Sequence, residues 1–176
     1  MRTALSIAGV AIFVLTAAGT ALAQGSGAEA LLKQLNITLP ADQAPAANFV
    51  NSVQAGKLLF LSGNTPGGQW PLKGKVGKDL TIEQGYESAR QTGLIMLGKI
   101  RTALGSLDRV KRVVKVLGMV NSADGFSDQP KVVNGFSDLM VEVFGEAIGK
   151  HARSAVGMAG LPGNAPIEVE MIVEVE

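Results

Sequence analysis

The chain has 176 residues, a length that suits one domain with an appendage, and carries 16 lysines and arginines against 15 aspartates and glutamates. This near-neutral charge, with no long run of either sign, argues against a nucleic-acid-binding protein. The absence of cysteine excludes a disulfide framework, a cysteine-based metal site and a cysteine nucleophile. The single histidine, His151, excludes multi-histidine metal clusters.

The first residues are typical of a secretory signal. Arg2 is followed by an uncharged apolar stretch and then by small residues at Ala21 and Ala23. We expect residues 1–23 to be a signal peptide, so that the mature chain, residues 24–176, is periplasmic or secreted and has no stable membrane anchor. The alternative is an uncleaved anchor helix, which normally needs ~20 apolar residues, a length this segment nearly reaches.

Short elements precede the first long helix, and glycine and proline mark their boundaries. They are an N-terminal extension over residues 24–45 with a short helix over 28–35 and a linker, two extended runs over 49–54 and 57–63 that predict a strand pair, and a loop over 63–79.

Two long helices and further strands follow. Thr81 and Gln84 form a capping-box pattern that starts a helix, and Gly105 ends it. Residues 110–121 are rich in β-branched side chains and predict a strand, and the next apolar helical face runs over 129–147. In the tail, from Ile167 to the C-terminus, apolar residues alternate mainly with glutamates, which only a strand with one buried face explains.

The predicted order is therefore β-β-α-β-α-β, an α+β domain with four or five strands in a mixed sheet. Two helices cover one face of such a sheet. The other face needs a partner, because a sheet must bury its apolar surface. The sequence therefore predicts an oligomer.

Few residues stand out as chemical groups. The sequence has no nucleotide-binding loop, zinc-protease motif or nucleophile elbow, and no spacing supports a triad built on His151. Arg153 is a planar donor suited to a carboxylate, although a surface arginine pairing with a helix end or a glutamate is the commoner reading. Glu168 lies near the start of the last strand, where a solvated strand face is the alternative.

Four short blocks resemble the signature of a known family. They are Leu61-Ser62-Gly63, Arg153-Ser154, Leu161-Pro162 and Ile167-Glu168-Val169-Glu170. These blocks are similar to those of the reactive intermediate deaminase family, also called RidA or YjgF-like, over a domain that spans residues 46–176. The resemblance implies a chorismate-mutase-like fold assembled as a homotrimer, with three clefts between subunits.

The resemblance also implies a reaction, the hydrolysis of small enamine or imine acids to keto acids and ammonia, without a cofactor or metal. Arg153 would bind the substrate carboxylate and Glu168 would hold or activate the water. Ser62, Gly63 and the backbone at Ala155 would complete the pocket.

Two positions depart from the family. One is Ala155, because the residue after the Arg-Ser pair is often a cysteine in the family. Phe49 stands where the deaminases usually carry a tyrosine, so a hydroxyl that could donate a hydrogen bond is missing. The alternative function is a non-catalytic module that binds a small carboxylate or another protein on the same trimeric scaffold. No nucleic-acid partner is expected.

Overall fold

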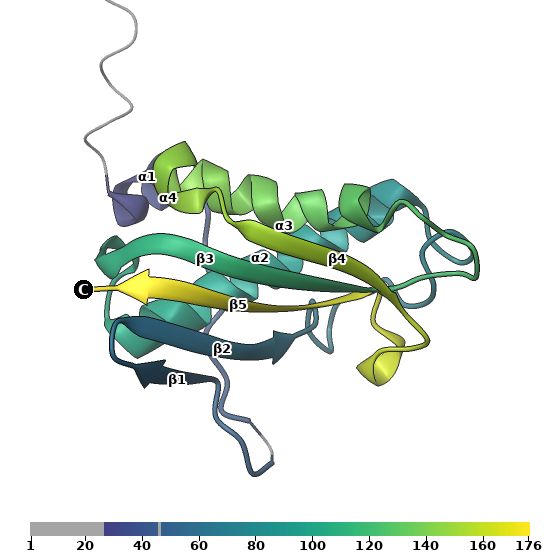
Figure 1. Cartoon of the computed structure of the whole chain (residues 1–176), viewed down its shortest axis with the longest axis horizontal. Helices are drawn as coiled ribbons and strands as arrows, with labels where there is room; N and C mark the ends of the chain where they lie inside the picture. The colour runs from purple at the N-terminus through teal and green to yellow at the C-terminus, as the bar shows by residue number, and fades with distance from the viewer. Residues whose placement is uncertain (1–26, 46) are drawn as a thin grey trace, which may run out of the picture.

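The computed structural model describes residues 27–45 and 47–176, so the expected signal peptide over 1–23 lies outside the described residues. One mixed sheet of five strands, in the order β1-β2-β5-β3-β4, has the long helices α2 and α3 on one side (Figure 1). The helices are α1 (Ala28–Gln34), α2 (Ile82–Leu104), α3 (Gln129–Phe144) and α4 (Glu146–Gly149), with short 3-10 helices at Leu107–Arg109 and Pro162–Asn164. The strands are β1 (Ser52–Ala55), β2 (Leu58–Asn64), β3 (Val110–Asn121), β4 (Ala152–Met158) and β5 (Ile167–Val175).

This architecture confirms the predicted α+β domain with a mixed sheet. The fifth strand is β4, which runs parallel to β3 at the sheet edge. The second long helix ends at Phe144, earlier than predicted, because Gly145 takes a φ of 73° and its N–H bonds back to the Val141 carbonyl. Such a positive φ favours glycine and ends the helix.

The start of α2 follows the sequence closely. The Thr81 hydroxyl accepts a hydrogen bond from the Gln84 N–H at 3.2 Å, and the Gln84 side chain accepts one from the Thr81 N–H at 2.9 Å. Gly105 ends the helix with a φ of 82°. The capping box and the glycine stop therefore confirm the predicted helix at both ends.

The core lies between the sheet and the two long helices. Alternate residues of each central strand face the helices and are buried there. They are Leu59 and Leu61 of β2, Val113, Val116 and Val120 of β3, and Ile167, Val169, Met171, Val173 and Val175 of β5.

The described residues leave the opposite face of the sheet uncovered. We call it the open face; it carries apolar side chains that are about half exposed, including Val53 and Phe49 (both 56%), Phe60 (41%) and Val156 (40%). Phe49, Val53 and Phe60 line a hollow of about 590 Å³ together with Lys115 and Ile172. Val156 lies further along the same face. A contiguous apolar surface of this kind is typical of an interface.

The contact between α2 and α3 depends on a missing side chain. A Cβ at Gly135 of α3 would overlap the backbone carbonyl oxygen of Tyr86 on α2, which cannot rotate away. We expect Gly135→Ala to lower the free energy of unfolding by about 1–3 kcal/mol, because the helices must separate. The measurement is chemical denaturation, with Gly160→Ala as control, since a Cβ at Gly160 meets no atom of the described residues within 4 Å. Equal stabilities of the two variants would contradict this packing.

Candidate functional site

Arg153 is held by α3. It lies on the edge strand β4, and its Nη1 donates to Asn134 Oδ1 at 2.8 Å and to Ser137 Oγ at 3.0 Å, while Nη2 reaches the Pro130 carbonyl only at 3.5 Å. Both Nη1 hydrogens are therefore used. Among the described residues Nε has no hydrogen-bond partner, so the edge formed by Nε and Nη2 is open to a carboxylate with two parallel bonds.

His151 holds the Ser137 hydroxyl that contacts Arg153. Its Nδ1 lies 2.6 Å from the Gly149 carbonyl oxygen, which can only accept, so Nδ1 carries the proton in the neutral ring. Nε2 then accepts from the Ser137 hydroxyl at 3.0 Å, and the same hydroxyl accepts from Arg153. This chain of hydrogen bonds fixes the guanidinium. The partner of Nδ1 is a backbone carbonyl, where a Ser–His–Asp triad would have a carboxylate.

The protonation of His151 is linked to folding. Burial lowers the pKa of His151, and the charge of Arg153 lowers it further against the opposing effect of the Gly149 carbonyl. The unfolded chain therefore binds a proton more readily, and stability is lost as pH falls from the ordinary histidine value of about 6.5 toward the lowered one. We expect urea denaturation to show this loss in the wild type and a smaller one in His151→Gln, whose amide does not titrate. The same pH dependence in both proteins would contradict it.

Glu168 lies on the open face, near the start of β5. It is half-buried, and burial raises the pKa of its carboxyl group, with a further increase from the neighbouring Glu170. A Cβ at Gly63 would overlap the Glu168 carboxylate, so glycine at position 63 leaves the space that this side chain occupies. A carboxyl group placed in a cleft can act as a general base or acid.

The remaining predicted residues divide between the two sides of the sheet. The Ser62 hydroxyl donates to the Val50 carbonyl at 2.7 Å, so it fixes the chain before β1, and both Ser62 and Phe49 line the open-face hollow. Ala155 is half-buried on β4 and packs against the core. As an edge strand, β4 leaves every other backbone N–H and C=O unpaired within this chain.

A single chain does not bring Arg153 and Glu168 together. Arg153 pairs in the sheet with Val116 and points toward α3, whereas Glu168 pairs with Met119 on the opposite face and lies two strands away. Strand spacing and rise place their Cα atoms roughly 14 Å apart. Within one chain the two residues therefore do not share a site.

Sequence reasoning missed Asn134 and Ser137. Together with Pro130, which contributes its carbonyl oxygen, they lie at positions i, i+4 and i+7 of α3. This helix runs beside β4 (Figure 1). Helical spacing could have predicted that these residues share one face of α3. It could not have predicted that this face contacts Arg153. Among the described residues, no three acidic or histidine side chains lie close enough to hold a metal ion, and none of the helices there has the length and apolar character of a membrane span.

Comparisons with known proteins agree with this fold. A family model described as "YjgF/chorismate_mutase-like, putative endoribonuclease" matches residues 29–175. The chain belongs to the RidA/YjgF family. Protein TCP17 of Trypanosoma cruzi is 47% identical over 147 residues, which cover 81% of this chain and 91% of that protein.

Solved RidA/YjgF structures show the same architecture. Atu1372 of Agrobacterium tumefaciens, of unknown function, is 39% identical, with 84% of this chain and 91% of that one covered at a TM-score of 0.76. A Shewanella oneidensis protein described as a "putative endoribonuclease" is 30% identical, with 85% of this chain and 100% of that one covered at a TM-score of 0.80. The family and the chorismate-mutase-like fold are thus confirmed, and membership supports a general small-molecule deaminase or binding role.

Proposed function

We propose that this protein is an exported RidA-like homotrimer that hydrolyses small enamine or imine acids to keto acids and ammonia. The observation that carries the proposal is the guanidinium of Arg153, which α3 orients with one fork edge left open for a carboxylate. Export rests on the sequence of residues 1–23, and the acid substrate on the charge and planarity of Arg153.

Each cleft would be shared between two copies of the chain. Arg153 and Glu168 lie on opposite faces of one sheet, so one cleft can contain both only if different subunits supply them. The apolar open face supports such an assembly, because Val53, Phe60 and Val156 would become buried in it. Light scattering at micromolar concentration should give three times the mass of the mature chain, and a monomer would refute the shared cleft.

The proposed reaction needs only proton transfers and a water molecule. Arg153 holds the carboxylate of the imine acid, whose nitrogen is protonated, and Glu168 takes a proton from the water that adds to the C=N carbon. The carbinolamine nitrogen then receives that proton from Glu168. Ammonia leaves as the carbinolamine hydroxyl returns its proton to Glu168, and the keto acid remains. Glu168 is the candidate for both proton transfers, and burial, followed by the neighbouring Glu170, raises the pKa of its carboxyl group.

The test is ammonia release from imines generated freshly from a panel of amino acids. We expect the wild type to accelerate hydrolysis of at least one small imine acid, and Arg153→Ala to lose this acceleration. An imine without a carboxylate is the matched control and should not be a substrate. If the protein binds keto acids through Arg153 without any turnover, the function is the binding module instead, a result compatible with Phe49 and its missing hydroxyl.

A further inference from the structure

A second pocket lies away from the open face, between α2 and the N-terminal segment. It has a volume of about 500 Å³, within the range of roughly 300–1,000 Å³ that holds small ligands. Three parts of the chain form it: residues 40–43, the loop over residues 64–70, and one face of α2. The pocket contains neither Arg153 nor Glu168, so it is separate from the proposed cleft.

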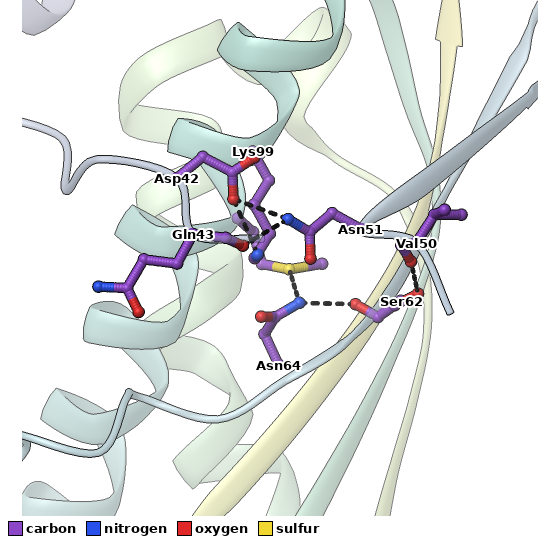
Figure 2. A network of polar contacts seen from close by, with 8 residues as sticks. Asp42, Gln43, Val50, Asn51, Ser62, Asn64 and Lys99 are labelled. Atoms are coloured by element: carbon purple, nitrogen blue, oxygen red, sulfur yellow. Dashed lines mark hydrogen bonds and ion pairs between the residues drawn. The ribbon is translucent and has the colours of Figure 1, made fainter. Parts of the chain in front are cut away.

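A buried ion pair forms one wall of this pocket. Lys99 Nζ lies 2.9 Å from Asp42 Oδ1, and the two side chains are only 7% and 15% exposed. Asn51 Nδ2 donates to the same Asp42 oxygen at 2.9 Å and to the Gln43 carbonyl at 2.8 Å. Figure 2 shows how these contacts join α2, the N-terminal segment and the chain before β1. The wall is therefore fixed before any ligand arrives.

The ion pair leaves hydrogen-bonding capacity unused. Lys99 has three N–H donors, of which one is used by a described residue, and Asp42 Oδ2 accepts no hydrogen bond from the described chain. Both residues line the pocket. A ligand that accepts one bond from Lys99 and donates one to Asp42 would complete this wall without separating the pair.

The other walls are apolar or carry neutral amides. The indole N–H of Trp70, the only polar group of its side chain, donates a hydrogen bond to Ser88 Oγ at 2.9 Å. The Trp70 ring therefore has only carbon atoms left to contact a ligand, and it lines the pocket with Ile95. Gln69 and Gln91 also line the pocket, and neither side chain has a hydrogen-bond partner among the described residues. The pocket thus combines an apolar wall with neutral donors and acceptors.

These groups favour a neutral ligand over a charged one. A zwitterion such as a free amino acid would have to give up the hydration of two charges, at a cost of several kcal/mol each, to face protein charges that already neutralise each other. A hydroxyl group costs far less to desolvate and can both donate and accept. Two adjacent hydroxyls match the unused Asp42 oxygen and Lys99 N–H groups.

We infer that this pocket binds a neutral polyhydroxylated ring compound, of one or two sugar rings, with vicinal hydroxyls on the Asp42–Lys99 pair and a C–H face against Trp70. The proposal is independent of the imine hydrolase proposal.

The test uses the fluorescence of Trp70, which is the only tryptophan in the chain and so reports on this pocket alone. The full-length mature protein is titrated with glucose, N-acetylglucosamine, maltose and cellobiose, and with glycine and alanine as zwitterionic probes. We expect a saturable change with at least one sugar in the millimolar range. Lys99→Met should weaken its binding by about tenfold or more, because a hydrogen bond to a charged group is lost.

Two controls keep the outcome clear. Lys33→Met makes the same substitution at an exposed position on α1 and should not change sugar binding. If Lys99→Met does not fold, Gln91→Ala decides instead: it removes an amide that lines the pocket and has no described hydrogen-bond partner, and it should also weaken sugar binding. The inference is overturned if no sugar saturates, if Lys99→Met or Gln91→Ala binds as the wild type does, or if the amino acids saturate and the sugars do not.

Discussion

Glu168→Gln is expected to reduce hydrolysis by about 10²–10⁴-fold while it spares the binding of a keto acid such as pyruvate. The amide keeps the shape of the carboxylate above Gly63 but cannot take a proton from water. The measurement compares kcat for imine hydrolysis with the calorimetric affinity for pyruvate. Loss of both to the same extent would mean that Glu168 holds the substrate or the fold and not the proton.

Glu170→Gln is the matched control for this variant. Glu170 lies on the same face two residues away, is exposed, and raises the pKa of the Glu168 carboxyl group after the larger effect of burial. Removing its charge should leave kcat near the wild-type value at neutral pH and move the acid limb of the pH–rate profile to lower pH. An unchanged acid limb would assign that limb to another group.

Arg153→Lys is expected to weaken binding of the same keto acid by about tenfold to a hundredfold. An ammonium is a point charge and cannot reproduce the two parallel bonds from the Nε and Nη2 edge. The substitution also removes the two hydrogen bonds from Arg153 Nη1 to Asn134 and Ser137 that orient the side chain. The measurement is calorimetric titration, together with KM for an imine acid.

Arg112→Lys is the control for this substitution, because Arg112 of β3 is an exposed arginine whose one ion pair within the described chain, to Glu174, is 3.9 Å long. It should bind the keto acid as the wild type does. Undiminished affinity in Arg153→Lys would show that the open edge of the guanidinium does not receive the carboxylate.

The predictions that held rest on local chemistry. The alternation of apolar residues and glutamates in β5 and the capping box at Thr81 are determined within a few residues, and both describe the structure. The boundary of β4 was harder to predict, because an edge strand that is only partly buried has no strong alternation. The early end of α3 depends on the positive φ of Gly145. The sequence does not show that this glycine leaves the helical conformation, because a glycine within a helical pattern can also stay helical.

The site was only partly accessible from sequence. The resemblance identified Arg153 and Glu168 as site residues. The face of the sheet on which each residue lies depends on the strand register and on the strand order β5-β3-β4. A register is set by long-range pairing, which spacing along the chain does not contain. The residues that orient Arg153 were missed for the same reason, since the contact of α3 with β4 exists only after folding.

The shared cleft is tested most directly by mixing two inactive variants. Arg153→Ala and Glu168→Gln chains are unfolded, combined in equal amounts and refolded together. If neighbouring subunits supply the two residues, random assembly restores both native groups in about one quarter of the clefts, so the mixture should regain about that fraction of wild-type activity. A mixture no more active than the two variants refolded separately would contradict a cleft made from two copies of the chain.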